Sequence, residues 1–161
     1  MGRLRLEDGD GMKRELRVRR IKNGTVIDHI AAGHALNVLR ILGIADGSTE
    51  VVSVVMNVSD QKKDIVKIED WELAPDEVDK IALISPDAII NIIRDYEVVE
   101  KRKVVLPSQI VGVVRCMNPN CITNTDEPVK PRFVIRRGER VELHCVYCGR
   151  VITDQIAEFL I

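Results

Sequence analysis

The chain contains four cysteines, and their spacing is that of a metal site. They are Cys116, Cys121, Cys145 and Cys148, so a C-x4-C pair is followed after 23 residues by a C-x2-C pair. Zn²⁺ prefers four soft ligands at the corners of a tetrahedron, and two short cysteine pairs on separate turns supply them. Because the protein would then fill every coordination position, we predict one structural zinc ion per chain and no catalysis at the metal.

Two disulfide bonds are the alternative use of four cysteines. They would require an oxidising compartment and usually occur in small secreted domains. The first 20 residues are charged and lack the apolar core of a signal peptide, and no segment approaches the roughly 20 apolar residues of a membrane span. We therefore favour zinc, a cytoplasmic location and no membrane partner. His144 can in principle replace a thiolate, but with four cysteines present we expect it beside the metal or at the surface.

A second group of residues suits the binding of an anion. Asp28 and His29 lie in one predicted strand, Lys63 and Lys67 bracket another, and Lys101 closes a third. If these strands are neighbours, the side chains can converge on a phosphorylated ligand, because lysine attracts phosphate, a carboxylate accepts from ribose hydroxyls and histidine donates to an oxyanion. The alternative is that the lysines are solvated and protect strand edges from pairing.

No group of residues indicates catalysis. The thiols are assigned to the metal, and neither G-x-G-x-x-G nor G-x-x-x-x-G-K-[ST] occurs. The three histidines, His29, His34 and His144, lack the spacing of a catalytic or metal site, and His34 fits the start of a helix. We therefore expect a binding protein rather than an enzyme.

Length and composition favour two small domains. The chain has 161 residues, a net charge of -1 and 3% aromatic residues, with isoleucine and valine prominent among its apolar positions. A near-neutral surface with few aromatic residues argues against nucleic acid as a partner. Four arginines near the cysteines keep a zinc-ribbon nucleic-acid-binding protein as an alternative: Arg132, Arg136, Arg137 and Arg140.

The first 106 residues predict a leader and an α+β domain. Residues 1–14 show no sustained periodicity and are expected to be a flexible leader. Over 15–106 the expected elements are an extended segment over Leu16 to Ile30 with a turn at Asn23-Gly24, a helix over Ala35 to Leu42, strands over Glu50 to Val58 and Lys63 to Glu69, a helix from Pro75 to Ser85, and strands over Ala88 to Ile93 and Tyr96 to Val105. The β-branched run of Glu50 to Val58 is typical of a central strand covered on both faces. This order predicts a ferredoxin-like antiparallel sheet with two helices on one face.

Residues 107–161 predict a small β zinc-ribbon-like domain. Leu106-Pro107 marks the boundary, and the cysteines are surrounded by short expected strands near Gly112 to Arg115, Arg132 to Arg136, Val141 to His144 and Arg150 to Thr153. Bound zinc would explain how so small a domain remains folded.

Several strings in the chain resemble one known family. They are I-K-N-G-T-V-I-D-H-I at 21–30, D-I-V-K-I-E at 64–69, D-Y-E-V-V at 95–99 and C-M-N-P-N-C-I-T-N at 116–124. With the four-cysteine spacing they resemble, in the same order, the regulatory chain of aspartate carbamoyltransferase, from about Leu16 to the C-terminus. The resemblance implies a non-catalytic chain of pyrimidine biosynthesis whose first domain binds nucleoside triphosphates, among CTP, ATP and UTP, and pairs with a second copy. It also implies that the zinc domain docks on catalytic chains.

The same resemblance implies the residues of an effector site. Asp28 and Lys67 would hold the ribose, and His29, Lys63 and Lys101 would face the triphosphate. The base and sugar pocket would be lined, in part through backbone groups, by Ile21, Val26, Asn91, Ile93, Tyr96 and Val98. For Tyr96 the alternative is an aromatic filler in an aliphatic sheet. Arg19 and Arg20 differ from the acidic or small residues of the familiar bacterial pattern. They can therefore strengthen triphosphate binding or reduce the discrimination between nucleobases.

A stand-alone nucleotide-binding enzyme is a further alternative. It would need a catalytic group that the chain does not offer, so turnover by the purified chain alone is the observation that would favour it.

Overall fold

The computed structural model describes residues 20–44, 48–58 and 60–161. The expected leader over 1–14 and the start of the extended segment, including Arg19, lie outside the described residues. Across the ranges that are described, none of the helices has both the length and the apolar character needed to cross a membrane.

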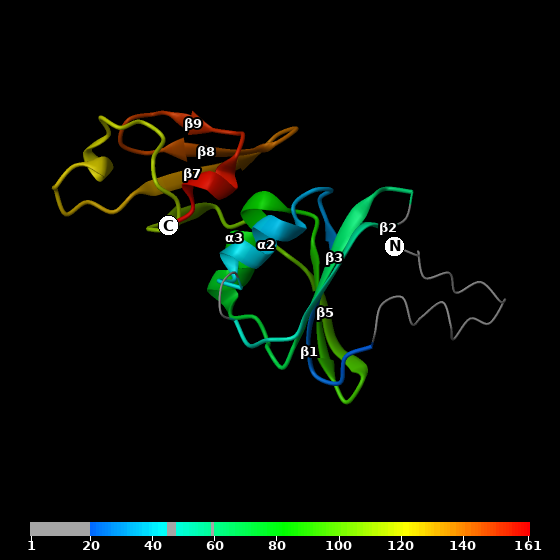
Figure 1. Ribbon diagram of the computed structural model, residues 1–161. Coiled ribbons are helices and arrows are strands. Elements are labelled where there is room, and N and C mark those ends of the chain that lie inside the picture. Colours follow the sequence, from blue (N-terminus) through cyan, green and yellow to red (C-terminus); the bar gives the residue numbers. More distant parts are fainter. Residues whose placement is uncertain (1–19, 45–47, 59) are drawn as a thin grey trace, which may run out of the picture.

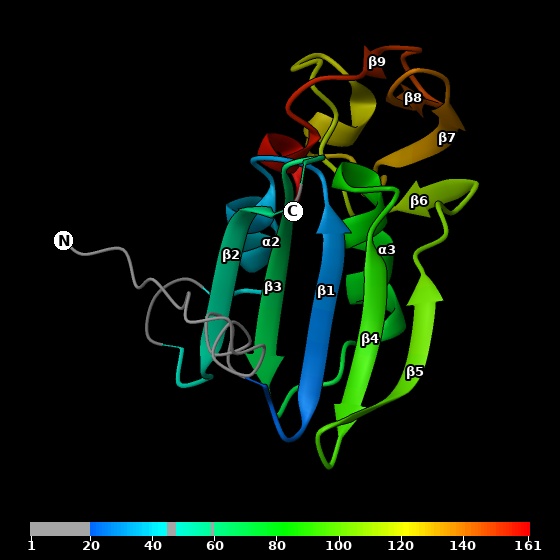
Figure 2. The same cartoon turned by 90° about the vertical axis from the view of Figure 1, so that its right-hand side faces the viewer.

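The N-terminal module is a five-stranded antiparallel sheet with two helices on one face (Figures 1 and 2). Its elements are β1 (Gly24–Ile30), α2 (Ala35–Ile41), β2 (Val52–Val58), β3 (Lys63–Glu69), α3 (Pro75–Ile84), β4 (Ile89–Arg94) and β5 (Glu97–Lys103). The strand order is β2-β3-β1-β4-β5, which confirms the predicted ferredoxin-like plan. Figure 2 shows the sheet with both helices behind it, and no other helix or strand of the described residues covers the opposite face, which is called the open face below.

Strict alternation divides the strand residues between the two faces. In β3, Asp64, Val66 and Ile68 are buried while the residues between them are half-buried, because successive side chains point to opposite sides of a strand. Ile27 of β1 and Ile90 of β4 are fully buried on the same side as Val66. The core therefore lies between the sheet and the helices, and the intervening residues form the open face.

The prediction of a central strand over Glu50 to Val58 was wrong. The run does form a strand, β2, but β2 lies at the edge of the sheet with β3 as its neighbour. Val51 is 59% exposed and Met56 is 44% exposed. β-Branched residues favour an extended backbone at any position in a sheet, so a run of them does not reveal how many neighbours the strand has.

A buried carboxylate joins three parts of this module. Asp64 is fully buried, and its oxygens accept hydrogen bonds from the backbone N–H groups of Gly33 at 3.1 Å, Ala35 at 3.3 Å and Asn57 at 3.0 Å. Ala35 begins α2, where no side chain of the helix itself caps the free N–H groups. Asn57 has a φ of 60° and lies in a bulge where two residues of β2 oppose Asp64. Asp64 therefore fixes the start of α2 against the bulge in β2.

The C-terminal module is a four-stranded antiparallel sheet of order β6-β7-β8-β9. Its elements are β6 (Gln109–Val111), the 3-10 helix η1 (Ile122–Asn124), β7 (Arg132–Arg137), β8 (Val141–Cys145), β9 (Val151–Ile152) and the 3-10 helix η2 (Ile156–Phe159). Phe133 and Leu143 are fully buried at its centre. Three of the four strands expected here are confirmed.

The first strand of this sheet begins earlier than predicted. The expected strand over Gly112 to Arg115 is replaced by β6, which ends before Gly112 because that residue has a φ of 71°. Val114 instead forms an isolated bridge with Leu160. The helix η2, which the sequence did not predict, packs against α3 and joins the two modules.

We predict that replacing Asp64 by alanine lowers the free energy of unfolding by about 3 kcal/mol, since three buried N–H groups lose their acceptor. Urea denaturation measures this change. Asp79→Asn on the exposed face of α3 is the control and should change stability by less than about 0.5 kcal/mol. Equal stability of the two variants would show that Asp64 does not fix this junction.

Candidate functional site

The four cysteine sulfurs converge at one point of the C-terminal module. All four Sγ atoms lie within 4.8 Å of one another, with Cys116 and Cys148 at 3.5 Å and Cys121 and Cys145 at 3.8 Å. A disulfide would need a separation of about 2.05 Å, and the four thiols are free. Four sulfurs around an ion with metal–sulfur bonds of about 2.3 Å lie about 3.8 Å apart, so the donor set fits a tetrahedral metal.

Backbone turns position the first cysteine pair. The N–H of Cys121 donates to the carbonyl of Asn118 at 3.0 Å, and the amide of Asn124 donates to the carbonyls of Cys116 at 2.9 Å and Asn118 at 2.7 Å. The Thr123 hydroxyl donates to Cys121 Sγ at 3.2 Å. These bonds hold the loop closed around its two sulfurs.

The second pair spans the end of β8, at Cys145, and the turn that follows it, at Cys148. The N–H of Gly149 donates to the carbonyl of Cys145 at 3.0 Å, and Gly149 adopts a φ of 78°, which favours glycine. His144 lies next to this pair, but its Nε2 atom pairs with Glu142 at 3.0 Å. The expectation that His144 is not needed as a ligand therefore agrees with its position.

Burial and mutual proximity separate the pKa values of the thiols. Desolvation, together with hydrogen bonding to Cys148, raises the pKa of Cys116 to about 12, and desolvation also raises the pKa of Cys145. At Cys148, burial opposes ionisation, but hydrogen bonds from the Arg150 backbone and the Asn118 side chain prevail and lower the pKa to about 7. Four thiolates in so small a volume require a cation, which is what the geometry accommodates.

The residues expected to bind an effector meet on the open face of the sheet. Val26 of β1 lies opposite both Lys67 of β3 and Asn91 of β4, and Asn91 lies opposite Lys101 of β5. Directly opposed residues point to the same side of an antiparallel sheet, so these four form one row across four strands. The Asn91 amide donates to the Val26 carbonyl at 3.2 Å, which fixes its orientation.

Apolar residues lie on one side of this row, toward Gly24 of β1. Ile93 of β4 lies opposite Gly24 and Val98, and the turn between β4 and β5 carries Tyr96, which is 51% exposed. Ile21, which precedes β1, is only 5% exposed. The N–H of Tyr96 donates to the Lys22 carbonyl at 2.9 Å, so the start of the described chain is tied to this turn.

The other side of the row, toward Asp28 of β1, is polar. Asp28 and His29 form a bulge in β1 opposite Ile65, with His29 at a φ of 56°. Asp28 accepts from the His29 backbone N–H at 2.7 Å and lies 3.3 Å from His29 Nδ1. Lys63 is the first residue of the neighbouring strand β3. It lies four residues before Lys67 and on the same face of the sheet.

The open face therefore forms a strip along β1. Gly24 and Asp28 mark its apolar and polar ends, and at a rise of about 3.3 Å per residue they are roughly 13 Å apart. Basic side chains from β3 and β5 flank the middle of the strip. Such a strip can hold an elongated ligand with an apolar ring at one end and anionic groups at the other.

The electrostatics of the strip favour an anion. Burial, together with the positive charge of Arg20, lowers the pKa of Lys67. Desolvation and a neighbouring cation both disfavour the charged form of a lysine. A bound anion nearby would offset both effects and stabilise the ammonium group.

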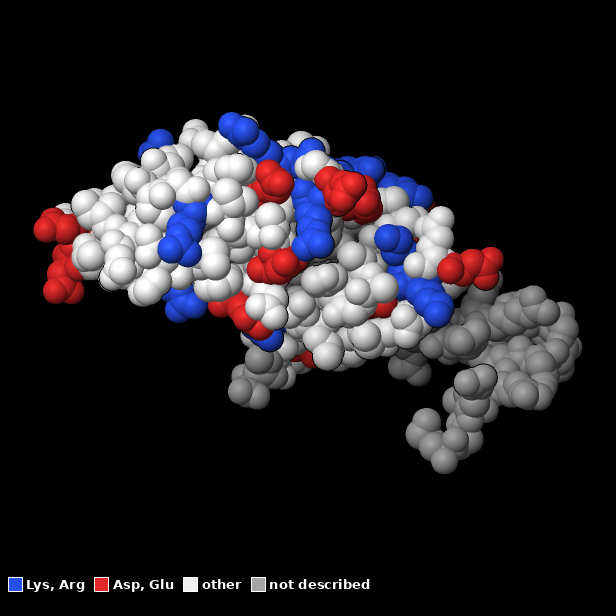
Figure 3. All heavy atoms as spheres, turned by 90° about the horizontal axis from the view of Figure 1, so that it is seen from above, with Lys and Arg blue, Asp and Glu red and all other residues white. Residues whose placement is uncertain are grey.

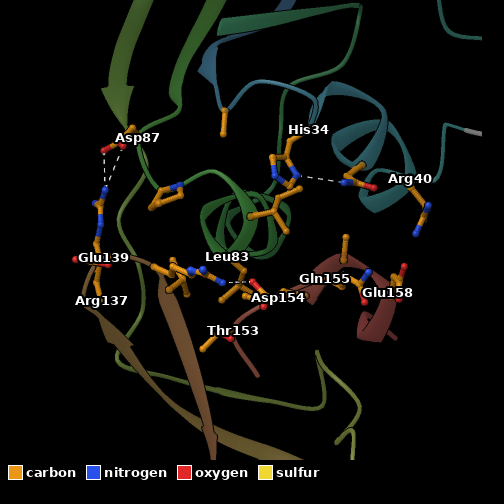
Figure 4. Close-up of a pocket in the computed structure, with 18 residues that line it drawn as sticks. His34, Arg40, Leu83, Asp87, Arg137, Glu139, Thr153, Asp154, Gln155 and Glu158 are labelled. Atoms are coloured by element: carbon orange, nitrogen blue, oxygen red, sulfur yellow. Dashed lines mark hydrogen bonds and ion pairs between the residues drawn. The ribbon is translucent and has the colours of Figure 1, made fainter. Parts of the chain in front are cut away.

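A separate cavity of about 520 Å³ lies between the helices and the C-terminal module (Figure 4). None of the predicted effector residues lines it. Two of its three arginines pair with carboxylates: Arg137 Nη2 donates to both Asp87 oxygens at 3.0 and 3.1 Å, and Arg140 pairs with Asp154. The third arginine, Arg40, shares the lining with the carboxylates of Glu139 and Glu158. The Arg137 hydrogen bond, opposed by slight burial and aided by Lys103, lowers the pKa of Asp87. The cavity therefore offers no surplus positive charge to a nucleotide.

The same pairing weakens the alternative of a nucleic-acid-binding ribbon. Two of the four arginines proposed for it, Arg137 and Arg140, form ion pairs. Basic and acidic side chains also lie side by side on the face seen from above in Figure 3. A nucleic-acid surface would instead present a basic patch.

Sequence reasoning missed two residues that organise these sites. Asp64 was predicted only as part of a strand, although its two-residue spacing from Val66 and Ile68 places it on their face, where a buried charge must find donors. Asp87, which bridges to β7, carries no signal in the sequence because its partner is 50 residues away.

Comparisons with known proteins agree with both halves of this structure. A family model described as the aspartate carbamoyltransferase regulatory chain, allosteric domain, matches residues 16–105, and one for its metal binding domain matches residues 108–158. The aspartate carbamoyltransferase regulatory chain of Methanothrix thermoacetophila is 60% identical to this chain, and the match covers 93% of this chain and 99% of the relative. The regulatory chain of Methanosarcina acetivorans is 59% identical, and the match covers 92% of this chain and 98% of the relative. The relative from Methanothermobacter thermautotrophicus is 58% identical over 88% of this chain and 93% of its own length. The chain therefore belongs to the aspartate carbamoyltransferase regulatory chain family.

Proposed function

We propose that this chain binds a nucleoside triphosphate on the open face of its sheet and transmits that event, through a zinc-stabilised module, to catalytic chains of aspartate carbamoyltransferase. It does so without catalytic residues of its own. The proposal rests on one observation: Lys67, Val26, Asn91 and Lys101 form a row across four strands, and Asp28 and Lys63 lie on the polar side of that row.

The strip matches a nucleoside triphosphate in chemistry and in length. Ile21, Ile93, Tyr96 and Val98 would contact the base, and Asp28 with Lys67 would hold the ribose hydroxyls. Lys63, His29 and Lys101 would bind phosphate oxygens as cations or donors. The roughly 13 Å between the two ends suits an extended triphosphate.

The metal that suits the cysteine cluster is zinc. Four thiolates form a soft donor set, and a tetrahedron closed by protein atoms excludes the water that a catalytic zinc would keep. When bound, zinc would supply the positive charge that four thiolates need. Its role would be to hold the Cys116 and Cys145 turns together.

Exposed apolar residues support two protein contacts. Close to the cysteines, Met117, Ile122, Val146 and Tyr147 are 41 to 48% exposed, which suits docking on a catalytic chain. The partly apolar strand β2 is an edge of the sheet formed by the described residues, and such an edge suits pairing with a second copy.

Regulation then requires that the nucleotide bind differently to two states of the assembly. A ligand with equal affinity for both states would shift nothing. Couplings of this kind are typically about 1 to 3 kcal/mol, enough for a several-fold change in the affinity of a distant site.

Lys101→Gln should weaken CTP and ATP binding roughly ten-fold in calorimetric titration, since a charge-assisted contact to phosphate is lost at an exposed site. Arg102→Gln is the matched control, because Arg102 neighbours Lys101 on β5 but points to the opposite face. Unchanged affinity in Lys101→Gln, or equal losses in both variants, would contradict the proposed site.

Nucleotide binding should be accompanied by proton uptake at alkaline pH. The pKa of Lys67 is lowered in the free chain, so between that pKa and the ordinary lysine value of about 10.4 the amine is partly neutral. A bound anion raises the pKa again, and the amine then takes up a proton. Titrations in two buffers of different ionisation enthalpy measure the uptake, which Lys67→Met should abolish. The same uptake in that variant would assign the proton to another group.

Cys145→Ser should release the metal and unfold the C-terminal module, because binding free energy at such a site is folding free energy. Metal analysis should find one zinc per wild-type chain and much less in the variant, and near-UV circular dichroism should report loss of packing. Thr125→Ala, in the loop near the site, is the control and should retain the metal. Full zinc content and unchanged packing in Cys145→Ser would contradict the proposal of a structural zinc site at the four cysteines.

A further inference from the structure

Arg20 holds an unusual position at the apolar end of the strip. Its Nη2 atom donates to the Tyr96 carbonyl at 3.0 Å, and its guanidinium carbon lies 5.8 Å from the centre of the Tyr96 ring. The positive charge of Arg20 also reaches Lys67, whose pKa it helps to lower. Arg20 therefore lies against the β4–β5 turn and within electrostatic reach of Lys67.

Arg20 is fixed in place although it is exposed. Ile21, the next residue, is buried, and the Lys22 carbonyl accepts from the Tyr96 N–H at 2.9 Å. Backbone contacts thus hold both sides of the pair, and the guanidinium is ordered by an aromatic face and a carbonyl. An ordered guanidinium loses less conformational entropy when it binds a ligand than a free side chain would.

The donors of Arg20 are not used up by this contact. A guanidinium has five N–H donors in a rigid plane, and within the described part of the chain Arg20 donates one hydrogen bond, to the Tyr96 carbonyl. Among the described residues, no carboxylate forms an ion pair with Arg20. Apolar and aromatic residues at this end are Ile21, Ile93, Tyr96 and Val98, and Glu69 of β3 lies opposite Gly24 on the same face.

We propose that Arg20 reads the edge of the nucleobase and favours a base with two neighbouring hydrogen-bond acceptors, as cytosine and guanine have, over adenine. This rests on the proposed function, since it assumes that the apolar end receives the base. A planar guanidinium pairs with two adjacent acceptors in a fork, whereas the amino group of adenine places a donor against it. The triphosphate lies at the other end of the strip, near Lys63 and Lys101, and its binding does not depend on Arg20.

The test compares three ligands by calorimetric titration of the full chain: CTP, ATP and ribose 5-triphosphate, which lacks a base. Arg20→Ala should weaken CTP binding about five- to ten-fold, at the low end of the range for a bidentate pair because the side chain is exposed. The affinities for ATP and ribose 5-triphosphate should change less than two-fold. Lys22→Ala, an exposed cation two residues along, is the matched control and should leave the preference unchanged.

Each other outcome overturns the inference. An equal loss for all three ligands would mean that Arg20 contacts phosphate or only supports the turn, and no loss for CTP would mean that it makes no contact. A thermal unfolding midpoint equal to that of the wild-type chain excludes a folding defect as the cause. If the wild-type chain binds none of the three ligands, the proposed function itself fails, a result that is distinct from a lost preference.

Discussion

The hydrogen bonds of the buried Asp64 carboxylate are the constraint on which the open face depends. A buried carboxylate is tolerated only when donors surround it, and here the donors come from the N-terminal end of α2 and from the bulge in β2. Asp64 lies on the core side of β3, so its neighbours Lys63 and Ile65 face the open side. A one-residue slip of β3 would bury the lysines and expose this charge, which makes the register of the strip energetically strict.

The two modules divide stability and binding between them. The cysteine cluster is closed, its four sulfurs directed at one another, and it can hold a metal without leaving a position for a substrate. The sheet of the N-terminal module has one face that no other described element covers, and that face carries Lys67, which is partly desolvated. Asp87 ties Lys103, the last residue of β5, to Arg137 of β7, so the strand that carries Lys101 is joined directly to the metal module. That ion pair is exposed and contributes little stability, but it places the two sheets in contact.

Local signals in the sequence predicted most of the fold. The strand over Lys63 to Glu69, the helix that begins at Pro75 and the convergence of the four cysteines were each predicted from nearby residues, and each was confirmed. The edge position of β2 and the early start of β6 were missed, because neighbours and strand ends are set by tertiary packing. Lys67, Asn91 and Lys101 lie close together because β3, β1, β4 and β5 are neighbours in the sheet. The residues of a single strand do not reveal this order, which can be predicted only once the overall fold is recognised. Bulges such as the one at Asp28 and His29 leave no reliable trace in a single sequence.

The central claim is that this chain converts nucleotide binding into a change in a partner's activity. The most direct test assembles it with aspartate carbamoyltransferase catalytic chains and measures the aspartate saturation curve with and without CTP or ATP. We expect the half-saturating aspartate concentration to shift several-fold with at least one nucleotide, and the shift to vanish when the regulatory chain is omitted. An assembled enzyme whose curve is the same with and without saturating nucleotide would contradict the account.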